Sequence, residues 1–132
     1  MSKAKFNENH KKIIDAIFEE IPEVKPGKMF GYPGYYIGGK LFACIYMNGV
    51  GLKLPEKLAN QLRERDYIDY FQPLGRKKMR EWIQINRVKS EDYYKDKDVL
   101  FSSLSYVASI AGVNISLDSF KTSESDFRIV KP

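Results

Sequence analysis

The sequence predicts a single α+β domain, a two-layer sandwich in which helices pack mainly on one face of an antiparallel sheet. An amphipathic segment opens the chain, glycine-containing turns then separate several short apolar segments, and another amphipathic stripe comes late in the chain. The turns are too short for the crossovers that parallel strands need, so the strands must form an antiparallel meander. Helices are the natural cover for its apolar face. We expect the order helix, three or four strands, helix, one or two strands, helix.

The first predicted helix covers residues 7–21. Asn7 or Asn9 would cap its start, and Pro22 would end it. The opposite face is charged, and we expect His10 to lie there. The apolar residues of the helix recur at spacings of three to four and form one stripe: Ile13, Ile14, Ile17, Phe18 and Ile21.

The next segment reads as a run of short strands separated by turns. Pro26-Gly27 is predicted to be a turn, and Gly31-Tyr32-Pro33-Gly34 a bend or a bulge. Gly38-Gly39 and Asn48-Gly49 are two-residue hairpin signals. The strands that these turns connect are 35–37, 41–47 and 50–54.

The second half of the chain adds two helices and a strand. Pro55, at the first helical position, begins a helix that runs through about Arg65. Residues 67–75 form an aromatic connection. Residues 79–88 form a strand with Trp82, Gln84 and Asn86 on one face and Ile83, Ile85 and Arg87 on the other.

The last predicted helix is capped by Asp96 or Asp98 and ends at Gly112. We therefore assign residues 1–112 to the domain and residues 113–132 to a C-terminal extension. Val99, Tyr106 and Ile110 widen the apolar face of the helix, and a homodimer is one assembly that this face would allow.

Composition narrows the class of protein. The chain has 132 residues and a net charge of +5. It contains a single cysteine, Cys44, and this count excludes an intramolecular disulfide and a cysteine-based metal cluster. No apolar run is long enough to span a membrane, and the first residues lack the apolar stretch of a secretory signal. We expect a cytoplasmic protein that makes no membrane contact and binds no cofactor or metal.

Three motifs resemble a known family in content and in order. They are Met29-Phe30-Gly31-Tyr32-Pro33-Gly34-Tyr35, Gly39-Lys40-Leu41-Phe42-Ala43 and Leu52-Lys53-Leu54. With them, residues 28–111 resemble the N-terminal domain of the TfoX/Sxy competence regulators. The resemblance implies a two-layer domain related in fold to YjbR-like and secretion-chaperone-like proteins.

The family also gives an expectation about function. Its full-length regulators promote natural competence in bacteria and carry a second, helical domain, whereas many members are stand-alone domains of unassigned biochemistry. Residues 113–132 are too few for that second domain. The resemblance therefore implies a stand-alone, non-enzymatic regulatory or protein-interaction module with an unidentified protein partner.

The family motif supplies the first candidate site. Its residues are Met29, Phe30, Gly31, Gly34, Gly39, Lys40 and Phe42. The structural interpretation is that Met29 and Phe30 pack under the first helix while the glycines form a bulge. The functional interpretation is a partner-binding edge, because glycines let another chain approach the backbone closely.

A basic segment supplies the second candidate site. Arg76, Lys77, Lys78 and Arg80 lie at a predicted hairpin tip, close in sequence to Trp82. Cations beside aromatic rings are typical of surfaces that bind single-stranded nucleic acid. The alternative is a solvated turn whose charges protect a sheet edge from aggregation.

Catalytic chemistry finds little support in the sequence. Cys44 lies in an apolar strand without the electropositive setting that activates a thiol. His10 is the only histidine and lies far in sequence from any plausible nucleophile. The acidic residues fall on helix faces and caps. We expect no catalytic residues and no enzyme.

Overall fold

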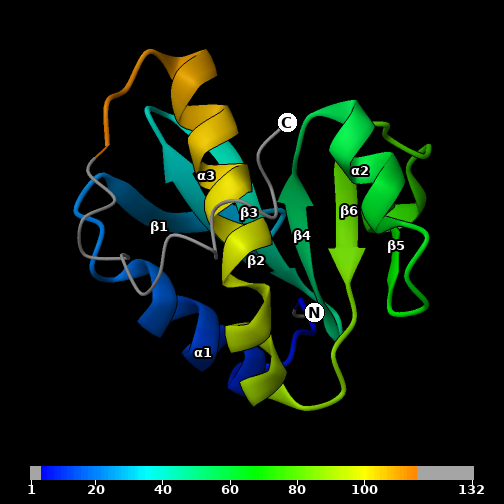
Figure 1. The fold of residues 1–132 in the computed structure, drawn as a ribbon. Helices are drawn as coiled ribbons and strands as arrows, with labels where there is room; N and C mark the ends of the chain where they lie inside the picture. The colour runs from blue at the N-terminus through cyan, green and yellow to red at the C-terminus, as the bar shows by residue number, and fades with distance from the viewer. Residues whose placement is uncertain (1–3, 116–132) are drawn as a thin grey trace.

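The computed structural model describes residues 4–115. They form an α+β fold with a six-stranded antiparallel sheet, which confirms the predicted fold class (Figure 1). The helices are α1 (Glu8–Phe18), α2 (Glu56–Leu62) and α3 (Lys97–Ala111), with short 3-10 helices η1 (Pro73–Gly75) and η2 (Ser90–Asp96). The strands are β1 (Val24–Met29), β2 (Tyr32–Ile37), β3 (Lys40–Tyr46), β4 (Gly49–Lys53), β5 (Ile68–Tyr70) and β6 (Trp82–Ile85).

The sheet is a four-stranded meander extended by a second hairpin. Its order is β1-β2-β3-β4-β6-β5, so β6 lies between β4 and β5. Gly38-Gly39 forms the predicted hairpin turn, with positive φ values of 55° and 79° that suit glycine. In the register of β4 with β6, Val50 pairs with Ile85 and Leu52 with Ile83, so the apolar side chains of both strands share one face.

That face carries the main core, and the three α-helices cover it (Figure 1). From α1 come Ile14, Ile17 and Phe18, from α2 Ala59 and Leu62, and from α3 Leu100, Leu104 and Val107. The sheet contributes Ile37, Phe42, Ile45, Leu52, Ile83 and Ile85, each fully buried. Within residues 4–115, no helix is both long and apolar enough to cross a membrane.

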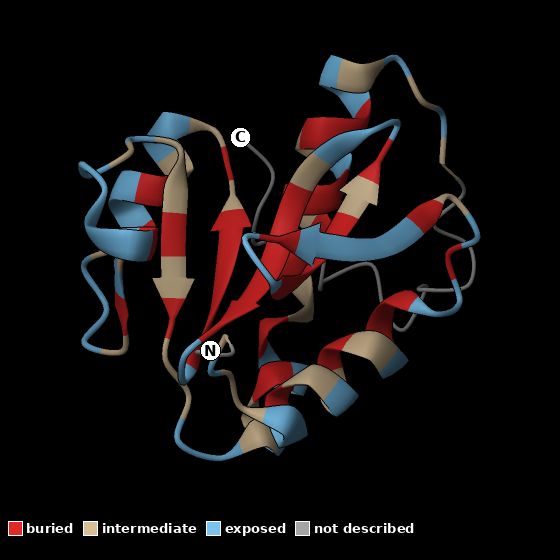
Figure 2. Cartoon of the chain, turned by 180° about the vertical axis from the view of Figure 1, so that it is seen from behind, coloured by how far each residue is buried: buried red, intermediate tan, exposed pale blue. Residues whose placement is uncertain are grey.

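The other face of the sheet carries a second, smaller cluster. Seen from behind, no helix crosses the sheet (Figure 2). The buried members of this cluster are Met29, Tyr32, Cys44, Tyr46 and Phe71. Side chains from the N-terminal segment and from the connection between β5 and β6 pack against it, which explains how a face without helices still buries aromatic rings.

The N-terminal helix is shorter than predicted, and its histidine lies on a different face from the predicted one. Asn7 caps α1 as expected, accepting a hydrogen bond from the His10 backbone N–H at 3.0 Å. The helix ends at Phe18, before the break that Pro22 imposes. The prediction of His10 on the charged face is wrong, because the ring is 1% exposed. It hydrogen-bonds Ser90 of η2, a contact between distant segments that helical periodicity does not reveal.

The prediction of a turn at Pro26-Gly27 is wrong, because both residues lie within β1. Pro26 pairs with Tyr35 in β2, and β1 is the edge of the sheet, where a proline need not donate to a second neighbour. The chain reverses at Phe30-Gly31 instead. The predicted bend or bulge at Gly31–Gly34 is therefore right only for Gly31, which lies in this turn, since residues 32–34 belong to β2.

The second half of the chain follows the predicted order with different boundaries. Pro55 is the cap residue of α2 rather than its first residue. The aromatic connection contains β5, and the strand predicted at 79–88 is limited to β6. Asp96 precedes α3 without a capping hydrogen bond, because its carboxylate binds Arg87. Gly112 ends α3 in the left-handed conformation, as predicted.

Candidate functional site

The connection from Phe71 to Glu81 covers the face of the sheet that has no helix. Phe71 lies over the bare backbone of Gly51, where a Cβ atom would be 3.0 Å from the Phe71 ring. The same ring packs against Tyr46 and Trp82, at centroid distances of 5.6 Å and 5.3 Å. The absent side chain at Gly51 thus makes the space that lets this connection lie close to the sheet.

Three large apolar side chains around this cover point to solvent. Phe30, Met47 and Leu74 are 57%, 44% and 57% exposed. They are also the described non-glycine residues with positive φ, at 51°, 53° and 55°. Such values are unusual for bulky residues and mark strain of about 1–3 kcal/mol each. We call these three residues the turn patch.

The members of the turn patch surround one buried tyrosine pair. The rings of Tyr32 and Tyr46 lie 4.7 Å apart, and each follows or precedes a patch residue by one or two positions. The Tyr46 hydroxyl accepts a hydrogen bond from the Leu74 backbone N–H at 3.0 Å. The Arg76 guanidinium lies 5.1 Å from the centre of the Phe30 ring. The β1–β2 turn, the β3–β4 turn and η1 are therefore joined around this pair.

The basic segment borders the turn patch, and its cations are exposed. Arg76, Lys77 and Lys78 make no ion pair in the described part of the chain, and Arg80 lies 4.0 Å from Glu56. Lys78 lies over the ring of Tyr70 at 4.7 Å, and Arg63 lies over the same ring at 4.0 Å.

Trp82 does not offer the free stacking surface that the sequence suggested. Its indole ring packs against Phe71 as part of the second cluster, and the neighbouring Tyr70 ring is occupied by cations. The exposed ring beside the basic segment is instead Phe30. The structure thus keeps the predicted cations at the surface but replaces the predicted aromatic partner.

The residues of the family motif lie in different environments. Met29 is buried in the second cluster, on the face away from α1, and Phe30 is exposed, so the prediction that both pack under the first helix is wrong. Gly31 has a φ of 86° and lies in the turn, whereas Gly34 lies in β2, where a Cβ would be 3.0 Å from Leu41.

The remaining motif residues lie at and beyond the next turn. Gly39 forms the β2–β3 turn and Lys40 beside it is exposed. Phe42 is fully buried in the main core, and its carbonyl oxygen accepts a hydrogen bond from the Ser103 hydroxyl at 2.9 Å. Most of the motif therefore builds the fold, and Phe30 is its exposed apolar member.

The two residues considered for nucleophilic chemistry are both buried. Burial raises the pKa of the Cys44 thiol to about 12 and lowers the pKa of His10. The His10 Nδ1 atom lies 2.6 Å from the Ser90 hydroxyl, and its Nε2 atom is buried without a partner in the described region. The His10 ring also meets Tyr93 edge-on at 4.8 Å, so this pair ties α1 to η2 inside the core.

The apolar face of α3 offers less surface for a partner than the sequence suggested. Val99 is 5% exposed and belongs to the main core. Tyr106 hydrogen-bonds Glu81 at 2.9 Å. Ile110 is half exposed. The homodimer stays a prediction, but the described part of α3 does not present the broad apolar face that such a dimer would use.

Sequence reasoning missed the turn patch, although a local signal for it exists. Phe30-Gly31 and Leu74-Gly75 both place a bulky apolar residue directly before a glycine, and both residues of each pair have positive φ. Tight turns of this kind prefer asparagine, aspartate or glycine at the first position. A large apolar residue there is a departure that the sequence alone displays.

Comparison of the chain with protein-family models, with curated proteins and with solved structures finds no match. The resemblance to the TfoX/Sxy N-terminal domain therefore rests on the motifs alone and remains a prediction.

Proposed function

We propose that this chain is a non-enzymatic protein-interaction module, of the TfoX/Sxy N-terminal type, that binds a partner protein through the turn patch. The observation that carries the proposal is the coincidence of strain and exposure at Phe30, Met47 and Leu74. Neither property stabilises the free chain. Exposed apolar area contributes no hydrophobic free energy to folding, and a bulky residue in the left-handed conformation adds strain energy. A partner that covers these side chains would bury the exposed apolar area, and the free energy of that burial would offset the strain.

The charge around the patch indicates what kind of partner it binds. Arg76, Lys77 and Lys78 border the patch without ion pairs among the described residues, and the chain carries a net charge of +5. The complementary surface is a protein segment that combines apolar side chains with aspartate or glutamate. A second copy of the chain would bring like charges together, which disfavours a homodimer through this patch.

The test is site-specific photo-crosslinking in the native host. A photoreactive phenylalanine analogue at position 30 or 74 should produce the same discrete protein adduct, and the same analogue at the exposed Val88, which is 96% exposed, should not. The crosslinked segment of the partner should contain acidic residues beside apolar ones. A basic segment, a second copy of this chain or no adduct would contradict the proposal.

A nucleic-acid-binding accessory protein is the second candidate, and it is favoured by the exposure of Arg76, Lys77 and Lys78, which make no ion pair in the part of the chain that the structure describes. Fluorescence anisotropy with a single-stranded oligonucleotide should then show affinity that falls steeply with salt. Replacing Arg76, Lys77 and Lys78 with glutamine should abolish most of the binding, whereas Lys12→Gln on α1 should not. A loss of binding free energy in Lys12→Gln about one third as large as in the triple variant would point to net charge rather than to this segment, because one charge is removed instead of three.

We place the protein in the cytoplasm as part of the same proposal. The sequence-based reasons given above support it, and fractionation of the native host is the direct check.

A further inference from the structure

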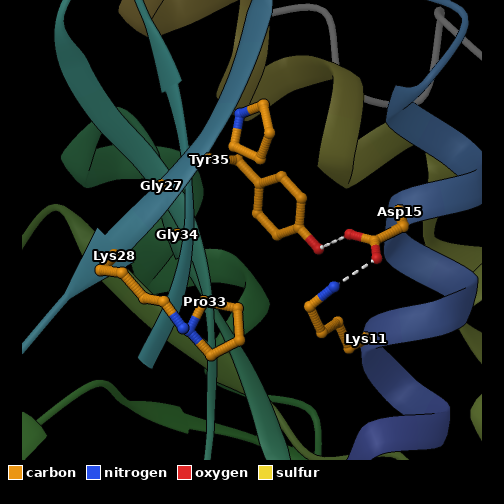
Figure 3. Close-up of a pocket in the computed structure, with 8 residues that line it drawn as sticks. Lys11, Asp15, Gly27, Lys28, Pro33, Gly34 and Tyr35 are labelled. Carbon is orange, nitrogen blue, oxygen red and sulfur yellow. Dashed lines mark hydrogen bonds and ion pairs between the residues drawn. The ribbon is translucent and has the colours of Figure 1, made fainter. Parts of the chain in front are cut away.

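A pocket opens between α1 and the first two strands, on the helical side of the sheet (Figure 3). Its volume is about 320 Å³, at the small end of the range for ligand sites. Its lining residues are Lys11, Asp15, Pro26, Gly27, Lys28, Pro33, Gly34 and Tyr35. The turn patch gathers around the cluster on the other face of the sheet, so occupancy of this pocket is independent of the proposed function.

The pairing of β1 with β2 explains the shape of the pocket. Pro26 pairs with Tyr35 and Lys28 with Pro33, so these four side chains share the sheet face that looks toward α1. Tyr35 contacts Phe18 of α1, with ring centres 5.4 Å apart. The two proline rings are compact and leave space beside this contact, which gives the pocket apolar walls.

Asp15 organises the polar side of the pocket. One of its carboxylate oxygens accepts a hydrogen bond from the Lys11 ammonium at 2.6 Å, and the other accepts one from the Tyr35 hydroxyl at 2.5 Å (Figure 3). Burial, together with Asp15, holds the pKa of Tyr35 far above its usual value, so the phenol remains a neutral donor. Each oxygen of Asp15 therefore already has a donor, and Lys11 is held in place.

Lys28 supplies the charge that is not neutralised. Its side chain extends along the sheet toward Pro33 (Figure 3), and its ammonium makes no ion pair within residues 4–115. With two lysines and one aspartate, the pocket lining carries one net positive charge. The groups left to meet a ligand are thus the ammonium of Lys28, the remaining N–H donors of Lys11 and the rings of the two prolines.

We propose that this pocket binds a small organic carboxylate with a flat apolar body. The carboxylate would lie against the ammonium groups of Lys28 and Lys11, and the body against the rings of Pro26 and Pro33. A cation is disfavoured, because the one carboxylate of the lining is already paired. Since Lys11 and Asp15 are 37% and 39% exposed, solvent weakens the ion pairing, and binding of a one-ring ligand should be in the millimolar range.

An NMR titration of the full chain with sodium benzoate tests the site. At constant ionic strength, benzoate should shift the backbone amides of Gly27, Lys28, Gly34 and Tyr35 in a saturable way, and benzamidine, its cationic counterpart of similar shape, should not. Lys28→Gln should weaken benzoate binding about tenfold, as expected for loss of one charge-assisted hydrogen bond. The matched control is Lys25→Gln, since Lys25 is an exposed lysine of β1 that pairs with Tyr36 on the opposite face.

Results of three kinds would overturn the inference. The first kind concerns the wild-type chain: no localised shifts at a benzoate concentration 50-fold above the expected millimolar dissociation constant, or a response to benzamidine as large as that to benzoate. The second is unchanged binding in Lys28→Gln with an intact spectrum. The third is an equal or stronger response to inorganic phosphate, which lacks the apolar body and would assign the pocket to inorganic anions. Each result leaves the crosslinking test of the turn patch unaffected.

Discussion

Gly51→Ala tests how the connection between β5 and β6 is held against the sheet. A Cβ atom at this position would lie 3.0 Å from the Cys44 sulfur and 3.0 Å and 3.1 Å from two carbons of the Phe71 ring. Ordinary carbon contacts are about 3.5–4.0 Å, so the neighbours would have to retreat by about half an ångström. Cys44 and Phe71 are 0% and 1% exposed, so neither can retreat into solvent. Overpacking of this kind costs about 1–3 kcal/mol.

The assay is urea unfolding followed by tryptophan fluorescence. Trp82 is the only tryptophan and packs against Phe71. In Gly51→Ala we therefore expect a lower urea midpoint of unfolding and a shift of the Trp82 emission to the red. Gly27→Ala is the matched control, since its Cβ would also lie 3.0 Å from a ring, but that ring belongs to the half-buried Tyr36, which can move. We expect a change of less than about 1 kcal/mol there. Wild-type stability and emission in Gly51→Ala would refute the account of how this connection packs.

Three further predictions concern buried groups. The pKa of His10 is lowered by burial, so the unfolded chain binds the proton more readily, and stability measured by urea unfolding should fall as pH drops below about 6.5; a wild-type pH dependence in His10→Phe would contradict this. Asp96→Ala should cost about 3–5 kcal/mol in the same assay, because it leaves the Arg87 guanidinium, 17% exposed, without its partner at 2.7 Å, and a loss below about 1 kcal/mol would argue against a buried pair. Cys44, whose pKa burial raises to about 12, should react with a thiol reagent at pH 8 only at the rate at which the chain opens, so immediate labelling of the folded protein would contradict its burial.

The order of the elements could be predicted from local patterns, and their boundaries less well. Alternation in the predicted strand 79–88 placed Ile83 and Ile85 on one face, and the structure buries both in the main core; Gly112 identified the end of α3. The prediction of a turn at Pro26-Gly27 failed because proline and glycine mark a turn in most contexts, whereas at a sheet edge they can also belong to a strand. Local sequence does not say which strand will be the edge.

The candidate site was predictable only in part, because exposure depends on contacts between distant segments. The basic segment is exposed as its composition suggested, but Trp82 is covered by Phe71, eleven positions earlier in a connection whose path the sequence does not reveal. His10 is buried by η2, eighty positions away. For Phe30 the prediction of a buried side chain failed, since its φ of 51° turns it away from the sheet.

The central claim is that Phe30, Met47 and Leu74 serve binding rather than folding. The most direct measurement is the free energy of unfolding of a variant in which all three are asparagine, which tolerates the left-handed conformation. We predict stability within about 1 kcal/mol of the wild type or higher, since relief of strain offsets the lost contacts, including the Arg76–Phe30 contact. The same variant should lose the crosslinked partner, tested with the photoreactive residue at position 76. A loss of more than about 3 kcal/mol would show that the turn patch is part of the folding core and would contradict the claim.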